Sequence, residues 1–194
     1  MSSRFLLKNI SRYVDLEEED AEQVHSILRP RHLSKREFLS QPGETCKYQS
    51  YVVKGSLRSY FIGTDGSEHT IQFAIEDWFI SDFRSYIEQS PGSLHIEALE
   101  DCELLQLSYE DTEQLCSSNA KFEHFFRIVA QKSFAFAQAR ILSNIGKTAE
   151  ERYLEFNTMY PEIVQRVPQY ALASYLGMSP EFLSKVRKRV ALKG

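Results

Sequence analysis

The chain has 194 residues, of which 42% are hydrophobic and 12% aromatic, and its formal net charge is −4. This composition excludes a disordered chain, and no apolar run approaches the roughly 20 residues that a membrane-spanning helix needs. The three cysteines are widely separated and form no CxxC pair, so they provide no zinc or iron–sulfur framework and suit a reducing compartment. The N-terminus becomes charged too early for a secretory signal, so we predict a cytoplasmic location.

A helix and a set of short strands are predicted for the first half of the chain. Residues 15–28 carry an apolar stripe at helical spacing, and Asp15 with Glu18 makes a capping pair at its start. From 32 to 107, short alternating runs are separated by turn sequences, of which Asp65-Gly66 is a strong hairpin signal. Strands this short and this regularly spaced predict a small antiparallel barrel or roll.

Helical spacing returns after the strands. Residues 109–116 are predicted as a short helix, and the stretch from 119 to about 145, without proline or glycine, as the longest helix of the chain. Its apolar residues cover more of the circumference than one core face needs; they are Phe122, Phe125, Phe126, Val129, Phe134, Phe136, Ile141 and Leu142. We expect the roll on one side and a second copy of the helix on the other, although a single well-buried helix would show the same pattern. Residues 148–160 are predicted as a further helix and 163–167 as an extended segment.

Residues 169–189 have the spacing of a helix-turn-helix. Gly177 supplies the left-handed turn between two short helices, and Ala173 stands where the first helix must admit the second. Ser179 and Pro180 predict an N-cap and the first residue of the second helix. The apolar residues that would lock the helices together are Leu172, Leu176, Met178, Leu183 and Val186. The opposite face of the second helix is polar and basic, as in a helix that enters the major groove of DNA.

The basic charge is concentrated in this last segment. Residues 163–194 contain six basic residues and one acidic residue, a net charge of +5, so the remaining 162 residues carry −9. A basic end on an acidic body is expected where one module meets phosphate and the other does not. A solvated terminal helix would carry similar charge, but the turn glycine and capping residues upstream favour DNA binding.

Five stretches stand out when these elements are taken together. They are Tyr51-Val-Val-Lys-Gly-Ser-Leu-Arg58, Phe79-Ile-Ser-Asp82, Ile96-Glu-Ala-Leu-Glu-Asp101, Leu107-Ser-Tyr-Glu-Asp111 and Tyr170-Ala-Leu-Ala-Ser-Tyr-Leu-Gly-Met-Ser179. By their order and spacing the chain, from about residue 15 to residue 190, resembles the Crp/Fnr family of bacterial transcription regulators. That family combines a cyclic-nucleotide-binding-like β-roll, a long dimerisation helix and a C-terminal helix-turn-helix.

The resemblance implies an α+β fold in three parts. Residues 1–118 would form the effector domain, an antiparallel β-roll of the double-stranded β-helix or jelly-roll type. Residues 119–146 would be the dimerisation helix, and 147–194 a small helix-turn-helix domain that lacks a complete wing. The implied partners are duplex DNA with an inverted repeat, a second copy of the chain through 119–146, and RNA polymerase; neither a membrane nor enzyme activity is implied.

The resemblance also places an effector pocket in the roll. The family's phosphate cassette reads Phe-Ile-Gly-Glu-Leu, followed ten residues after the glutamate by an arginine that neutralises a cyclic phosphate. Here Ser81 and Asp82 stand at the glycine and the glutamate, and Gly92 stands at the arginine. Loss of that contact weakens binding by at least roughly tenfold, so the roll is expected to take another small-molecule effector or none, rather than cyclic AMP in the usual way. The candidate pocket residues are Ser81, Asp82, Phe83, Arg84, Gly92, Ser93, Gln138 and Arg140.

The second helix of the tail also departs from the family, which often has Arg and Glu followed four residues later by Arg. Those places hold Pro180, Glu181 and Lys185. Glu181 can accept from cytosine N4 and Lys185 can donate to guanine, so the preferred operator should differ at the base pair of the first arginine. The basic residues that follow are expected to contact phosphates. The DNA-binding candidates are Ser179, Pro180, Glu181, Ser184, Lys185, Arg187, Lys188 and Arg189.

Two alternatives stay open on the sequence alone. One is a regulator that does respond to a cyclic nucleotide, through Asp82 and a displaced cation such as Arg84 or His95. The other is a cupin-like metal enzyme, which would need clustered ligands such as His-x-His with a nearby glutamate. The five histidines are scattered singly, so we expect no metal site, and a haem sensor stays open only through a histidine.

Overall fold

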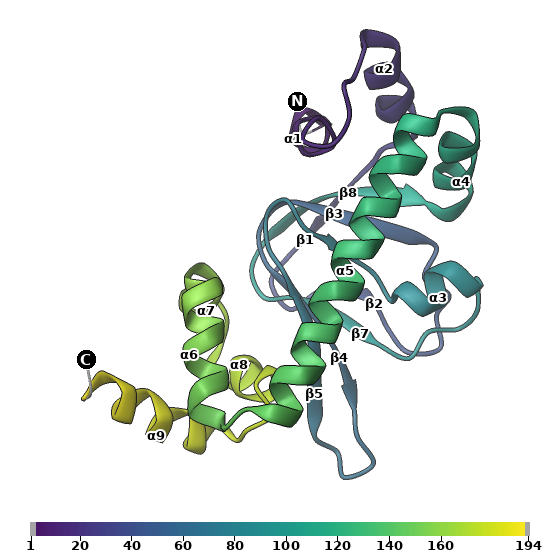
Figure 1. Ribbon diagram of the computed structural model, residues 1–194. Helices are drawn as coiled ribbons and strands as arrows, with labels where there is room; N and C mark the ends of the chain where they lie inside the picture. Colours follow the sequence, from purple (N-terminus) through teal and green to yellow (C-terminus); the bar gives the residue numbers. More distant parts are fainter. Residues whose placement is uncertain (1–2, 193–194) are drawn as a thin grey trace.

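The computed structural model describes residues 3–192 and shows a β-roll, one long helix and a group of short C-terminal helices (Figure 1). The strands are β1 Arg29–Leu33, β2 Phe38–Ser40, β3 Tyr48–Lys54, β4 Leu57–Ile62, β5 Glu68–Ala74, β6 Phe79–Ile80, β7 His95–Ala98 and β8 Cys102–Ser108. The helices are α1 Ser3–Ile10, α2 Glu18–Ile27, α3 Phe83–Glu88, α4 Tyr109–Ser118, α5 Ala120–Gly146, α6 Ala149–Met159, α7 Pro161–Arg166, α8 Gln169–Tyr175 and α9 Pro180–Ala191. Among these helices none is both long and apolar enough to cross a membrane.

The roll consists of two four-stranded sheets with the strand orders β1-β8-β3-β6 and β2-β7-β4-β5, and the paired strands are antiparallel. A core of side chains from both sheets lies between them, including Leu33, Val52, Leu57, Ile80, Ile96 and Leu104. Gly55 turns the chain from β3 into β4 with φ +103°, and a Cβ there would lie 2.8 Å from the carbonyl oxygen of Asp101. The antiparallel roll and the α+β class that the sequence predicts are both confirmed.

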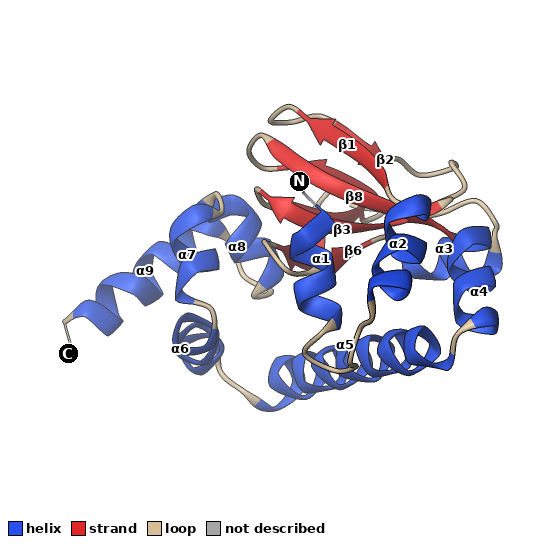
Figure 2. Cartoon of the chain, turned by 90° about the horizontal axis from the view of Figure 1, so that it is seen from above, coloured by secondary structure: helices blue, strands red, loops and turns tan. Residues whose placement is uncertain are grey.

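The first half of α5 covers one side of the roll together with α1, α2 and α4 (Figure 2). The predicted capping pair of Asp15 and Glu18 is wrong, because α2 begins at Glu18 after the cap residue Glu17. The cap is completed by Asp20, whose carboxylate accepts from the Glu17 amide at 2.9 Å and from Lys121 Nζ of α5 at 2.7 Å. Several acidic residues in a row satisfy the local pattern, and the contact with α5 selects the one that is used.

Three helices differ from the sequence prediction, and one of them is α3, which interrupts the run of strands expected over 32–107. The structure adds α1, whose residues Leu6 and Ile10 are buried against the roll. The predicted extended segment over 163–167 is wrong, because α7 extends from Pro161 to Arg166. Proline at the first position presets a helical φ, and burial of Ile163 and Val164 in the C-terminal core outweighs the strand preference of β-branched residues.

Candidate DNA-binding helix and effector pocket

The last two helices form the two-helix unit that the sequence predicts. Gly177 has φ +67° between α8 and α9, and the amide of Met178 donates to the carbonyl oxygen of Ala173 at 3.0 Å. The hydroxyl of Ser179 accepts from the Phe182 amide at 3.2 Å, so it caps α9, which begins at Pro180. Leu172, Leu176, Leu183 and Val186 are buried between these helices and α6 and α7.

The outer face of α9 carries most of the predicted DNA-binding residues. Glu181, Lys185 and Lys188 are exposed, and within residues 3–192 neither lysine makes an ion pair, nor does the exposed Arg187. Hydrogen bonds from its own amide and from Ser179 lower the pKa of Glu181, so its carboxylate stays ionised and is an acceptor.

Two predicted contact residues point partly elsewhere. Ser184 is half-buried and its hydroxyl accepts from Gln169 Nε2 of α8 at 2.5 Å. Arg189 lies 3.5 Å from the carboxylate of Glu150 on α6. Sequence reasoning also missed Phe182, which is 44% exposed in the first turn of α9. An aromatic residue on an otherwise polar face is the signal that could have found it.

The helix-turn-helix is fastened to the roll by side chains that the sequence does not connect. The hydroxyl of Ser174 in α8 accepts from the Thr70 amide at 2.8 Å and donates to the Glu68 carbonyl at 2.6 Å, so it covers the edge strand β5. Arg166 donates to Glu76 and Glu100 of the roll, each at 2.6 Å. Arg166 is therefore a junction residue, although it contributes to the basic charge of the tail.

Arg140, predicted to line the effector pocket, also lies at this junction. It donates to the carbonyl oxygens of Thr70 at 2.7 Å, of Tyr175 at 3.1 Å and of Ile71, and its guanidinium stacks on the Tyr175 ring. Burial lowers the pKa of Arg140, since no carboxylate contacts it among the described residues. Gln138, the other predicted pocket residue of α5, is exposed.

The remaining predicted pocket residues surround the start of α3. Ser81 and Asp82 are buried, and the Asp82 carboxylate accepts from the amides of Ser93 at 2.8 Å and Leu94 at 3.0 Å. Phe83 is exposed, as are Ser93 and Arg84, whose guanidinium pairs with Glu88 of its own helix. The structure therefore brings Asp82, Gly92 and Ser93 together, and among residues 3–192 no basic side chain pairs with Asp82.

One cavity of the roll is smaller than a typical ligand site. A cavity of about 120 Å³ is lined by ten residues, namely Leu39, Ser40, Glu44, Thr45, Cys46, Lys47, Tyr48, Ser81, Ile96 and Gln106. Sites for drug-sized ligands usually measure about 300–1,000 Å³. A second cavity of about 280 Å³ lies among His32, Lys54 and Glu103 and includes none of the predicted pocket residues.

The second half of α5 presents apolar side chains to solvent. Phe134 is 70% exposed and Ile145 80%, and Ile141 and Leu142 between them are also exposed. In Figure 2, α5 lies along one edge of the molecule, with the roll on one side and no other element beyond the other side. Exposed apolar side chains therefore form a row along this half of α5.

We compared the chain with family models, curated sequences and solved structures. The family model of the cyclic nucleotide-binding domain matches residues 30–119. A comparison with curated protein sequences finds no match.

Three solved structures resemble the chain over most of its length. The regulator CLP of Xanthomonas campestris, described as responsive to c-di-GMP, has a TM-score of 0.74 at 19% identity, covering 92% of this chain and 93% of its own. FixK2 of Bradyrhizobium japonicum has a TM-score of 0.73 at 19% identity, with 87% and 86% covered. A Crp/Fnr-family regulator from Eubacterium rectale has a TM-score of 0.71 at 19% identity, with 93% and 86% covered. The resemblance found in the sequence is thus confirmed: residues 30–119 match the cyclic nucleotide-binding domain, and the chain has the fold of solved Crp/Fnr regulators.

Proposed function

We propose that the chain is a dimeric DNA-binding transcription regulator of the Crp/Fnr type whose helix α9 enters the major groove. The observation that carries the proposal is the division of α9 into two faces. Leu183 and Val186 hold it on the rest of the domain, while Glu181, Lys185 and Lys188 face outward. Side chains of these types on the outer face of such a helix contact base edges and phosphates.

A second copy of the chain is the proposed partner of α5, through residues 119–146. Its exposed apolar row is explained if two copies pack side by side, and a two-fold dimer presents two α9 helices to an inverted repeat. We propose 1–118 as the effector domain and 147–194 as the DNA-binding domain. RNA polymerase is the proposed protein partner, since a regulator bound beside a promoter acts on it.

The roll is proposed not to bind cyclic AMP in the usual way. Gly92 offers no cation, and Arg84 is paired with Glu88 on its own helix.

The alternative, a cyclic-nucleotide-responsive regulator that uses Asp82 and another cation, predicts sub-micromolar binding of cyclic AMP or cyclic GMP in calorimetry. Cyclic di-GMP belongs in the same titration, because it is the ligand named for the Xanthomonas protein. For a metal enzyme there is no support: no three His, Cys, Asp or Glu residues of the described chain are grouped to hold a metal ion.

Selection of bound fragments from random DNA tests the proposal, and it should yield an inverted repeat. Lys185→Ala is expected to relax the preference at one base pair in each half-site, at a cost of about 1–3 kcal/mol for the preferred base. The matched control is Lys188→Ala, which should weaken all sequences equally and lower the salt dependence by about one phosphate contact. If Lys185→Ala also weakened all sequences equally, Lys185 would be a phosphate contact.

A further inference from the structure

The Asp82 carboxylate fills a cluster of backbone donors inside the roll. The side chain is 3% exposed. One oxygen accepts from the Ser93 amide at 2.8 Å and the Leu94 amide at 3.0 Å, and the other from the Ser85 amide at 3.3 Å. Three amides that converge on one carboxylate form an anion-binding arrangement, and here the anion belongs to the chain itself.

Gly92 is fitted to this carboxylate. A Cβ at position 92 would lie 2.7 Å from Asp82 Oδ2, so a side chain there would displace the carboxylate. The backbone around Gly92 is also closed, because its amide donates to the Glu44 carbonyl at 2.9 Å and its carbonyl accepts from the Gly43 amide at 2.9 Å. An external anion would have to expel Asp82 from these amides or lie against its buried negative charge, which is unfavourable.

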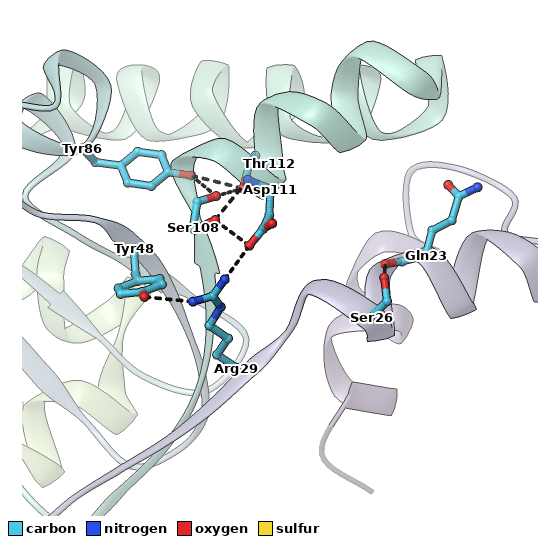
Figure 3. Close-up of polar contacts among 8 residues, drawn as sticks. All are labelled: Gln23, Ser26, Arg29, Tyr48, Tyr86, Ser108, Asp111 and Thr112. Carbon is cyan, nitrogen blue, oxygen red and sulfur yellow. Dashed lines mark hydrogen bonds and ion pairs between the residues drawn. The ribbon is translucent and has the colours of Figure 1, made fainter.

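Helix α3 also contacts the start of α4 through Tyr86. The Tyr86 hydroxyl lies 3.1 Å from Thr112 Oγ1 and 3.3 Å from the Ser108 carbonyl oxygen, at the start of α4 (Figure 3). Asp111 of the same turn is paired with Arg29 of β1 at 3.2 Å. Asp82 therefore joins α3 to the loop before β7, Tyr86 joins α3 to α4, and α4 packs on α5. A continuous set of contacts thus joins the roll to α5 through α3 and α4.

We propose that Asp82 is the resident anion of the roll: its carboxylate occupies the amides that an anionic ligand would need and holds α3 against the loop before β7 in place of such a ligand. The site therefore rejects phosphate-bearing molecules. The consequence for DNA, which rests on the proposed function, is that the protein binds its operator without any cyclic nucleotide.

The test removes the Asp82 side chain and then supplies a small carboxylate in solution. In the full chain, Asp82→Gly is expected to speed amide hydrogen exchange at Ser93 and Leu94 about tenfold, because both donors lose their acceptor. Sodium formate, which has the size of the missing group, should restore slow exchange at these two amides. Wild-type protein should show no change with formate, cyclic AMP or cyclic GMP, and its affinity for the selected operator should not respond to either nucleotide.

Two further variants keep the result interpretable. Asp82→Asn keeps a good cap for α3 and folds if the glycine variant does not; it should also exchange faster at Ser93, since one neutral oxygen replaces the charged acceptor. The matched control is Asp65→Gly, which removes another carboxylate that accepts from a turn amide, that of Ser67, and should leave Ser93 and Leu94 unchanged.

Either of two results would overturn the inference: unchanged exchange at Ser93 and Leu94 in both Asp82 variants, or operator binding by wild type that tightens when cyclic AMP or cyclic GMP is added. If the wild-type protein binds no DNA under any condition, that result contradicts the proposed function instead. In that case the formate rescue alone decides whether Asp82 is the resident anion.

Discussion

Gly177 is the residue that sets the turn between α8 and α9. At its φ of +67° an L-side chain is strained, yet the nearest heavy atom to a Cβ there is Arg152 Nη2 at 4.0 Å, so there is room for a methyl group. Gly177→Ala is therefore expected to lower the free energy of unfolding by about 1–2 kcal/mol, through backbone strain alone. Urea unfolding measures this.

Gly146 is the matched control for that substitution. It ends α5 without a left-handed φ, and nothing lies within 4 Å of the Cβ that alanine would add. Gly146→Ala should leave stability unchanged or raise it, because glycine is the poorer helix residue. Equal losses in the two variants would contradict the role given to Gly177.

Asp77 makes the free energy of unfolding depend on pH in the acidic range. Its carboxylate accepts from the Tyr51 hydroxyl at 2.5 Å and from Arg12 at 2.7 Å, which joins the end of α1 to the roll. Burial alone would raise the pKa of Asp77, but the hydrogen bonds from Tyr51 and Arg12 lower it below its ordinary value. A carboxyl with a lowered folded-state pKa stabilises the fold above its unfolded pKa of about 3.9 and loses that contribution as pH falls below it.

Asp77→Asn isolates this effect, because asparagine tolerates the positive φ of +69° at this position. We expect the variant to be less stable than wild type at pH 7 and the difference to shrink steadily toward pH 2. Urea unfolding across that range measures it. Parallel stability curves for the two proteins would show that the charge of Asp77 contributes nothing.

At the scale of elements, the sequence predicts those parts that carry a pattern of their own, even where their partners are distant in the chain, as for β1 and β8. The roll strands, α5, and the α8–α9 unit follow from alternation, helical spacing and the capping pair of Ser179 with Pro180. The sequence prediction missed α1, although Leu6 and Ile10 lie one helical turn apart. Its position on the roll depends on long-range contacts such as that of the Tyr51 hydroxyl with the Phe5 carbonyl at 3.1 Å.

The pocket shows the same limit. Motif spacing finds Asp82 and Gly92, and it shows that the arginine is missing. It cannot show that the carboxylate turns onto the amides of Ser93 and Leu94, because that depends on the path of the loop between them. Nor can it show that Arg140 leaves the pocket for carbonyl groups of β5 and α8.

The exposed row on α5 carries a prediction about assembly. Ile141→Glu places a charge on that row, where burial in a dimer would cost far more than exposure in a monomer. We expect the variant to sediment as a monomer and to lose its preference for inverted repeats over single half-sites. Met159→Glu, at an exposed apolar position on α6, is the control and should leave both properties intact. A dimeric Ile141→Glu protein would place the interface elsewhere.

At the scale of the whole molecule, the roll and the C-terminal domain share one core and one polar junction. Phe73 and Leu99 of the roll belong to the apolar cluster of the helix-turn-helix, and Phe73 packs on Tyr175 with ring centroids 5.2 Å apart. Ser174, Arg140 and Arg166 add hydrogen bonds across the same surface. The position of α9 relative to the roll is therefore fixed by packing as well as by the link from α5 to α6.

Arg140 tests that junction, because its half-buried guanidinium donates to carbonyl oxygens of β5 and α8. Arg140→Leu keeps the apolar stem but leaves the carbonyls of Thr70 and Tyr175 without a donor, at a cost of about 1–3 kcal/mol. Calorimetry should resolve the single unfolding transition of wild type into two, with the C-terminal domain melting first. Arg84→Leu removes an arginine that is paired only within α3 and should leave one transition. One sharp transition in Arg140→Leu, at the wild-type temperature, would mean that the apolar contacts around Phe73 alone join the two halves.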